Sequence, residues 1–282
     1  MVENRPWLVW LSHFVMILGV VIMAFPVWVT FVASTHDQAT MLRPPVPLLP
    51  GTHLIENYTE VLTKGYGTIN RTPVALTLMN SMIMALGVAI GKIIISILAA
   101  FAVVYFRFPG RMACFWAIFV TLMLPVEVRI VPTYGVVAAL GMIDTYQGLI
   151  IPLIASATAT FLFRQFFLSV PDELAEAARV DGASPMRFFV DILLPMSRTS
   201  IAAMFVIQFI YGWNQYLWPL LITTKESFYT SVMTVSRQAN VVDSVPSWNL
   251  LMAMAMLTML PPVIVVIFMQ RQFVRGLVET EK

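Results

Sequence analysis

Apolar runs separated by short polar connections fill most of the chain. A helix needs about 20 apolar residues to cross a bilayer core of roughly 30 Å. Runs of that length predict membrane-spanning helices over residues 7–32, 76–101, 112–132, 147–167, 199–222 and 250–270. The first run is longer than the roughly 7 to 15 apolar residues of a signal peptide, so we expect it to remain as an anchor. The pattern predicts an all-α integral membrane protein with six transmembrane helices in one domain, residues 1–282.

Composition and charge placement agree with a lipid environment. The chain is 59% hydrophobic and 11% charged, whereas soluble domains are about 45–50% apolar and about 25% charged. Positive side chains mark the cytoplasmic connections of membrane proteins. We therefore expect a multi-pass membrane protein with both termini in the cytoplasm. The side chains that set this orientation are Arg5, Arg107, Arg111, Arg164, Arg179, Arg187, Arg198, Arg271, Arg275 and Lys282.

Metal and nucleic-acid chemistry are both disfavoured. The single cysteine, Cys114, lies in an apolar stretch where we expect a buried thiol, and the three histidines are scattered without ligand spacing. A formal charge of +2 is too small for a nucleic-acid surface. The connection over residues 33–73 contains four prolines and a polar stretch around residues 57–72, so we expect a surface loop that faces an external partner.

The connection over residues 169–195 predicts two short helices joined by a tight turn. Ser169 and Asp172 have the spacing of a capping box, which favours a helix start there. Gly182 suits the left-handed residue after a helix, and Ser184-Pro185 suits the start of the next helix. Four apolar residues at helical spacing give the second helix one buried face, and Pro195 ends the pattern: Phe188, Phe189, Ile192 and Leu193.

The same connection resembles the EAA loop of bacterial ABC importer permeases. The likeness rests on Glu176-Ala177-Ala178, on Asp181-Gly182-Ala183, and on Ile192 with Leu194-Pro195. In that family the loop is a coupling helix that docks on the ATPase subunit. The small Ala177, Ala178 and Ala183 would allow close approach, and Glu176 would meet a basic group of the partner. The alternative is an amphipathic helix that lies on lipid headgroups. Such a helix would require neither Gly182 nor this order of residues.

The resemblance extends from about residue 77 to residue 276 and is closest to the carbohydrate-uptake branch of the family. Residues 140–145 and 148–152 resemble the outer connection of that branch, and Trp213-Asn214 with Trp218-Pro219-Leu220 resemble its fifth span. Within the branch, permeases of sn-glycerol-3-phosphate importers are the most similar. Residues 277–282 depart from the usual small-residue end of the family.

The resemblance implies a type I importer (MetI-like) fold in the bacterial inner (plasma) membrane, with its core over about 77–270 and the coupling loop at 169–195. It implies no cofactor in this chain and no catalysis, because ATP and Mg are bound by partner ATPase subunits. The expected partners are a second permease subunit in a heterodimer, two ATPase subunits, a periplasmic or extracellular substrate-binding protein, and membrane lipid. No nucleic acid is expected.

Four residues are candidates for the substrate path. Arg129 is a charged residue within a predicted span, at a position where sugar-carrying relatives usually have an uncharged residue, and its guanidinium would suit a phosphate. The alternative is that the side chain reaches the outer lipid headgroups or forms an ion pair with another span. Lys92 is a second charged residue within a predicted span and could also contact the substrate. The alternative is a structural charge that faces the interior of the helix bundle. Trp213 and Asn214 suit a sugar-like substrate, although an aromatic belt at the membrane interface explains the tryptophan equally well.

Gly87 and Gly91 lie four residues apart in an apolar run, which predicts close helix packing; the spacing to Lys92 is wrong for a phosphate-binding loop.

The sequence gives less support to functions other than import. A secondary transporter usually has intramembrane carboxylates, and Glu127 is the only acid in the predicted spans. A membrane enzyme needs a convergent catalytic set, which the spans do not supply. A neutral-sugar importer permease remains the main alternative, and a passive channel requires the loop resemblance to be fortuitous.

Overall fold

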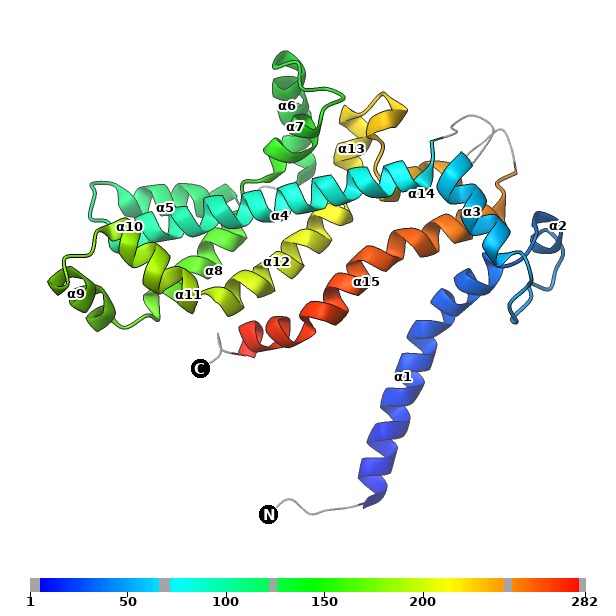
Figure 1. The fold of residues 1–282 in the computed structure, drawn as a ribbon, viewed down its shortest axis with the longest axis horizontal. Coiled ribbons are helices and arrows are strands. Elements are labelled where there is room, and N and C mark those ends of the chain that lie inside the picture. The colour runs from blue at the N-terminus through cyan, green and yellow to red at the C-terminus, as the bar shows by residue number, and fades with distance from the viewer. Residues whose placement is uncertain (1–5, 66–71, 122–125, 241–244, 279–282) are drawn as a thin grey trace. The chain divides into compact units, whose positions relative to one another are not determined.

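Figure 1 shows the computed structural model of the chain, which describes residues 6–65, 72–121, 126–240 and 245–278. Every regular element in these ranges is a helix, as the apolar pattern predicts, and no strand occurs in them. The chain divides into two compact units, residues 1–75 with 235–259 and residues 76–234 with 260–282. Both chain termini, on which the predicted orientation partly depends, lie outside the described ranges.

The first unit contains α1 (Pro6–Ala33), α2 (Gln38–Met41) and α3 (Leu54–Lys64). Most side chains of α1 are exposed and apolar, as expected of a helix whose solvent is lipid. Helix α3 buries Asn57, whose amide donates to the carbonyls of Ser34 and His36 at 2.9 and 2.8 Å. Asn249 in turn donates to the Asn57 carbonyl oxygen at 3.1 Å. The expectation that Asn57 lies on a surface loop is therefore wrong, because this amide organises the unit.

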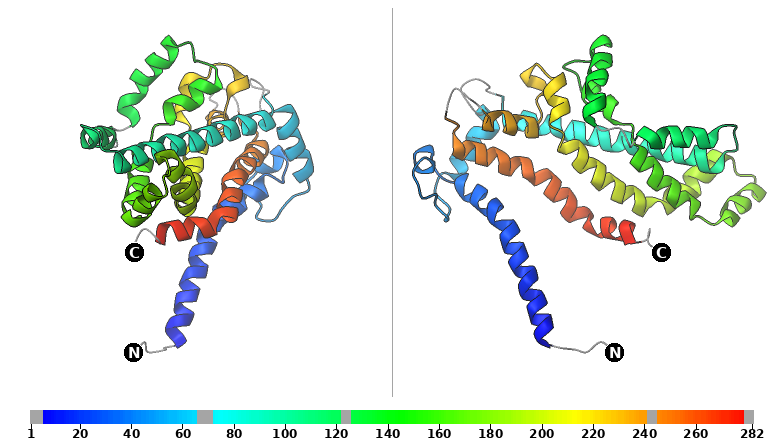
Figure 2. Two further views of the ribbon diagram at one scale, coloured as in Figure 1. Left: turned by 60° about the vertical axis from the view of Figure 1, so that its left-hand side comes forward. Right: turned by 180° about the vertical axis from the view of Figure 1, so that it is seen from behind.

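The second unit is built around the long helix α4, whose first two residues belong to the first unit (Figures 1 and 2). The coupling-loop helices α9 and α10 lie beside the C-terminal end of α4, and α12 runs along it. The elements are α4 (Val74–Tyr105), α5 (Arg111–Val120), α6 (Val126–Ala139), α7 (Tyr146–Ile150), η2 (Ile151–Leu153), α8 (Ala157–Leu168), α9 (Asp172–Val180), α10 (Pro185–Phe188), η3 (Phe189–Leu193), α11 (Leu194–Met196), α12 (Arg198–Trp213), α13 (Leu217–Ile222), η4 (Glu226–Phe228), α14 (Ser231–Ala239) and α15 (Trp248–Val278).

The structure keeps three of the six predicted spans as single long helices. These are residues Trp7–Ala33, Val74–Tyr105 and Trp248–Gln270, and two further pairs of helices become spans if each bent pair is counted as one. The predicted fourth span bends by 49° between η2 and α8. The predicted third span is divided between α5 and α6, with residues 122–125 outside the described ranges. Cys114 on α5 is exposed rather than buried.

A proline lies near the break in each of two predicted spans. Pro152 has no N–H to donate to the carbonyl of Gly148, which disfavours a regular helix at this point. That carbonyl instead accepts a hydrogen bond from Trp218 Nε1 at 3.1 Å. The predicted fifth span is divided into α12 and α13 at residues 214–216, and Pro219 lies in the first turn of α13, where a helix tolerates the missing N–H.

The two glycines of α4 allow the close packing that their spacing predicts. A Cβ atom at Gly87 would lie 2.6 Å from Ile150 Cδ1, and one at Gly91 would lie 2.6 Å from Ile154 Cγ2. Real Cβ atoms do not approach other heavy atoms so closely. The segment around α7 and η2 therefore packs so closely against α4 that a side chain at either glycine would require Ile150 or Ile154 to shift.

Candidate functional site: the coupling loop and the embedded charges

The first helix of the coupling loop, α9, starts without the predicted capping box. Its N-cap residue is Pro171, which has no side chain able to cap, and the Ser169 hydroxyl donates backwards to the Phe166 carbonyl at 2.7 Å. Asp172 and Glu173 lie in the first turn, where the positive end of the helix dipole favours acidic groups. The helix start is therefore placed as expected, but by charge rather than by a serine cap.

The end of α9 is a Schellman motif centred on Gly182. The Gly182 N–H donates to the Arg179 carbonyl at 3.0 Å, and the Ala183 N–H reaches back to the Ala178 carbonyl at 2.9 Å. Gly182 has φ of 72°, a left-handed conformation that costs other residues about 1–2 kcal/mol. No atom of the chain lies within 4 Å of a Cβ built there. The glycine is required by the backbone turn and not by crowding within this chain.

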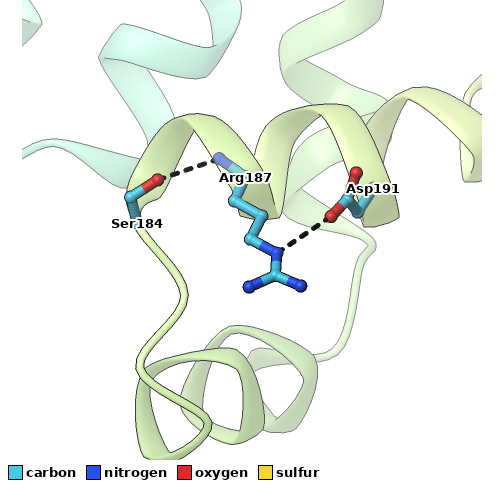
Figure 3. Close-up of polar contacts among 3 residues, drawn as sticks. All are labelled: Ser184, Arg187 and Asp191. Atoms are coloured by element: carbon cyan, nitrogen blue, oxygen red, sulfur yellow. Dashed lines mark hydrogen bonds and ion pairs between the residues drawn. The ribbon is translucent and has the colours of Figure 1, made fainter.

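The second helix begins as the sequence predicts (Figure 3). Ser184 Oγ accepts a hydrogen bond from the Arg187 N–H at 3.3 Å, and Pro185 occupies the first turn. Arg187 Nε also donates to Asp191 Oδ2 at 3.2 Å, in an exposed pair one helical turn apart. Such a pair contributes about 0.3–0.5 kcal/mol. The hydroxyl cap and the proline therefore do more than this ion pair to fix where the helix starts.

The coupling loop rests on an aromatic cluster at the C-terminal end of α4. The Phe189 ring lies 4.8 Å from that of Phe101, and the Phe188 ring lies 5.3 Å from that of Tyr105. Helix α8 joins the cluster through Phe167, 6.0 Å from Tyr105. Residues 189–193 form a π-helix, η3, and the chain bends by 73° between the 185–196 segment and α12. The predicted break after Pro195 is thus present, and the apolar face of the second helix is buried as expected.

The coupling-loop residues divide into an inward and an outward set. Ala178 is 6% exposed and packs into the cluster, with Ala183 and Ile192 partly buried beside it. Ala178 therefore lies inside the loop structure and not on the surface that a partner would meet. The exposed members are Glu176, Ala177, Asp181, Gly182 and Pro195.

An apolar side chain that the motif did not highlight also faces outward. Val180 at the end of α9 is 87% exposed, which makes it the most exposed large apolar side chain in the described part of the chain. It is flanked by the exposed Arg179 and Asp181. An apolar tip on a loop outside the membrane suits contact with another protein. Its position one residue before the C-cap, on the polar side of α9, was the available sequence signal.

Lys92 is a buried charge in the middle of α4. It lies 18 residues after Val74 and 13 before Tyr105, about 27 Å and about 20 Å along the helix axis. The side chain is 5% exposed, and Nζ lies 3.5 Å from the centroid of the Tyr211 ring on α12. Among the described residues, Lys92 has no hydrogen bond or ion pair. Its charge is therefore met only by the face of an aromatic ring.

Arg129 lies on α6 near the same place. Its side chain is exposed, while the neighbouring Ile130 is buried in a cluster that includes Val88 of α4 and Tyr211 of α12. Val88 lies one helical turn before Lys92, so the cluster joins the helices that carry both cations. Tyr211, whose ring lies against the Lys92 ammonium, belongs to the same cluster. The structure thus brings together the two charges that the sequence only suggested separately.

The aromatic candidates for the substrate path are mostly buried. Trp213 is 1% exposed and packs with Ala85, Ala89 and Phe209 in the core of the second unit. Asn214, the C-cap residue of α12, is exposed. Trp218 is also buried and donates to the Gly148 carbonyl. Of the pair at residues 213 and 214, only Asn214 offers a polar group at the surface of this chain.

Asp144 is a further organising residue whose role the sequence did not reveal. Its Oδ1 accepts hydrogen bonds from the N–H groups of Thr224 and Lys225 at 2.6 and 2.9 Å, and Oδ2 accepts from the Thr224 hydroxyl. Burial acts to raise the pKa of this carboxyl, but these hydrogen bonds and the Lys225 charge outweigh it, so the pKa lies below its usual 3.8. Asp144 joins the connection after α6 to the connection after α13.

Comparison with known proteins agrees with this geometry. The family of "binding-protein-dependent transport system inner membrane component" proteins matches residues 92–279. The sn-glycerol-3-phosphate transport system permease proteins UgpE of Agrobacterium fabrum, Brucella melitensis and Escherichia coli O157:H7 are each 56% identical over 282 residues, all of this chain and all of theirs.

A solved structure shows the same fold. A chain of a bacterial ABC transporter involved in the import of the acidic polysaccharide alginate matches with a TM-score of 0.82 and 19% identity, covering 97% of this chain and 99% of that one. The all-α importer-permease fold expected from the sequence is thereby confirmed, and the family match covers the coupling loop and both embedded cations. The chain belongs to the family of inner membrane components of binding-protein-dependent transport systems.

Proposed function

We propose that this chain forms half of the translocation path of an ATP-driven importer for sn-glycerol-3-phosphate or related glycerophosphodiesters. As a family member it is a multi-pass inner-membrane permease subunit, and ATP hydrolysis is carried out by a separate ATPase subunit. The substrate assignment is supported by relatives that are 56% identical over their full length and are named for sn-glycerol-3-phosphate transport. The two embedded cations suit the same anionic substrate.

The coupling loop carries the mechanistic part of the proposal. The exposed Glu176, Ala177 and Val180 present a charged and apolar surface beside the Gly182 turn. We propose that this surface docks on an ATPase subunit. The buried Phe188 and Phe189 fix the same loop to α4 and α8, so movement of the docked loop is passed to the membrane helices.

The remaining architecture is proposed from the family. The importer contains this chain and a second permease as a heterodimer, two ATPase subunits, and a binding protein outside the membrane. The whole chain acts as one transmembrane domain, with both termini and the 169–195 loop in the cytoplasm. Positive side chains in the connections on that side support this orientation, and Arg107, Arg179 and Arg187 are exposed there.

Uptake in cells tests the substrate and the coupling together. Cells that lack the gene, cells complemented with it, and cells carrying Gly182→Arg are supplied with radiolabelled sn-glycerol-3-phosphate or a neutral disaccharide. We expect only phosphate-ester uptake to depend on the gene. Gene-dependent uptake of the disaccharide alone would retain the importer but reject the phosphate substrate in favour of a neutral sugar.

Gly182→Asn is the matched control for the coupling loop. Asparagine tolerates a left-handed conformation better than other residues, and the chain itself leaves space for a side chain at this position. We expect Gly182→Asn to retain most uptake and Gly182→Arg to lose it, because the long charged side chain obstructs docking. Normal uptake by the arginine variant would contradict the docking role of this turn.

A further inference from the structure

Two helices of this chain carry embedded positive side chains, Lys92 on α4 and Arg129 on α6, and one apolar cluster joins these helices. Lys92 is 5% exposed and has no hydrogen bond or ion pair among the described residues, and Ile130, next to Arg129, packs in one cluster with Tyr211, the ring that Lys92 contacts. A charged group inside a bilayer is costly and is normally paired or placed where it has a function. Two like charges brought together without a described carboxylate favour an anion that arrives from outside the chain.

Tyr211 shows how Lys92 can be stable while such a site is empty. The ammonium lies 3.5 Å from the centroid of the Tyr211 ring, whose face attracts cations. This contact is weaker and less directional than a bond to an anionic oxygen. A lysine side chain has a flexible four-carbon stem and can leave the ring for a stronger partner. The ring therefore holds the charge without neutralising it.

We propose that Lys92 and Arg129 together bind the phosphate group of the transported substrate within the translocation path, with Tyr211 holding Lys92 when the site is empty. The inference rests on the proposed function and assigns its residues. The planar Arg129 guanidinium suits two phosphate oxygens at once, and the Lys92 ammonium supplies a point charge from the buried side. A neutral sugar gives neither cation a partner.

The placement of the pair fits the energetic demand of anion import. Lys92 lies near the middle of α4, where a phosphate is farthest from both aqueous sides. An anion entering the cell also moves against an inside-negative membrane potential. The charges of Lys92 and Arg129 offset both the loss of hydration and part of that opposing field. A binding protein outside the membrane cannot supply this stabilisation.

The test compares two substrates in proteoliposomes that contain the purified importer and its binding protein. At pH 7.5 sn-glycerol-3-phosphate is mostly a dianion, because the second phosphate pKa is about 6. Glycerophosphoglycerol, a diester, carries one negative charge. The variants are Lys92→Met, which keeps the stem without the charge, and Arg129→Gln. Arg129→Lys retains the charge, and Arg107→Gln removes an exposed arginine outside this site.

We expect Lys92→Met and Arg129→Gln each to lower the maximal rate of sn-glycerol-3-phosphate uptake by about tenfold or more, the loss typical of a hydrogen bond to a charged group. Diester uptake should fall less. The half-saturating concentration should stay constant, because the binding protein captures the substrate. Arg129→Lys should recover part of the rate, and Arg107→Gln should match the wild type.

Three outcomes would overturn the inference. Unchanged uptake in both neutral variants would show that the cations do not meet the substrate. Equal losses of uptake for both substrates would indicate that the cations have only a structural role. If Lys92→Met fails to assemble with the ATPase, the uptake of the exposed Arg129→Gln variant alone provides the test. A wild-type importer that transports neither phosphate ester would reject the proposed function and the inference together, whereas active wild type with unaffected variants rejects the inference alone.

Discussion

Removing the Asp144 carboxylate should destabilise the protein, because this carboxylate holds the connection after α6 against the connection after α13. The carboxylate accepts hydrogen bonds from two backbone N–H groups and from one hydroxyl. Its own N–H donates to the Ile222 carbonyl at 3.1 Å, and its φ is 54°. Three substitutions separate the hydrogen bonds from the backbone strain. Alanine removes the acceptor oxygens and is strained at positive φ, whereas glycine removes the acceptor oxygens without strain. Asparagine keeps one acceptor oxygen and tolerates this φ.

The magnitudes follow from these contacts. Hydrogen bonds to a charged acceptor contribute about 1.5–3 kcal/mol each, but water reaches this half-exposed site and replaces part of that. We therefore expect Asp144→Gly to destabilise by about 2 kcal/mol and Asp144→Ala by about 3 kcal/mol, since alanine adds about 1 kcal/mol of backbone strain. Asp144→Asn should cost under about 1 kcal/mol, because its Oδ1 can accept from both backbone N–H groups.

Thermal unfolding of the purified protein in detergent measures the series. A loss of 3 kcal/mol should lower the midpoint by roughly 6–12 °C, at about 2–4 °C per kcal/mol for a chain of this size. Hydrogen exchange should accelerate at Thr224 and Lys225 in the alanine and glycine variants and not in the asparagine variant. If asparagine destabilises as much as alanine, the charge and not the hydrogen-bond pattern holds the join, and this reasoning is refuted.

The pH dependence gives an independent check of the same contacts. The folded pKa of Asp144 lies below its usual 3.8, so the carboxylate contributes stability above about pH 4. That contribution is lost as pH falls through the lowered pKa. Asp144→Asn has no such titration at this position. The difference in unfolding midpoint between wild type and Asp144→Asn should therefore be constant near neutrality and should shrink below pH 4.

Three further predictions concern local packing and helix capping. Gly148→Ala places a Cβ 2.2 Å from the Met142 carbonyl oxygen and should destabilise by about 2 kcal/mol or more; Gly135→Ala, which meets nothing within 4 Å, should leave the unfolding midpoint unchanged or raise it. Ser184→Ala removes the cap of α10 and should cost about 1 kcal/mol, seen as faster hydrogen exchange at Arg187, with Ser184→Asp as the restoring control. Gly91→Val should lower the midpoint because its Cβ meets Ile154, and an unchanged midpoint would contradict the close packing of α4.

Local signals in the sequence predicted the local features of the coupling loop. The Gly182 turn and the Ser184 cap each depend on residues within a few positions, and both are found as expected. The capping box at Ser169 failed although its spacing was right, because Pro171 takes the N-cap position and the serine hydroxyl turns back to Phe166. A spacing rule does not account for the conformation of the residues between its two members.

The span pattern was predicted less completely. Hydropathy averages over about 20 residues, so it finds apolar segments but does not detect the local breaks near Pro152 and before Pro219 that divide two of them. Long-range pairs were not predictable from spacing at all. The contacts of Lys92 with Tyr211 and of Asp144 with Thr224 join segments far apart in the chain, and only the packing of the helices brings them together.

Helix α4 is the element on which both proposals depend. Its C-terminal end holds Phe101 and Tyr105 against the coupling loop, and Lys92 lies about 20 Å away along the same helix. Toward its other end, Asn80 donates to the carbonyls of Ser227 and Tyr229 at 2.8 and 2.9 Å.

Along this length α4 contains no proline, and its glycines are packed against neighbouring side chains, so it has no evident hinge. A displacement of the docked loop would therefore reach Lys92 as a movement of the whole helix and change its distance from Arg129 on α6. Weakening the Phe101–Phe189 contact with Phe189→Ala should then reduce uptake more than ATP hydrolysis. Equal loss of both activities would indicate that the contact serves only assembly.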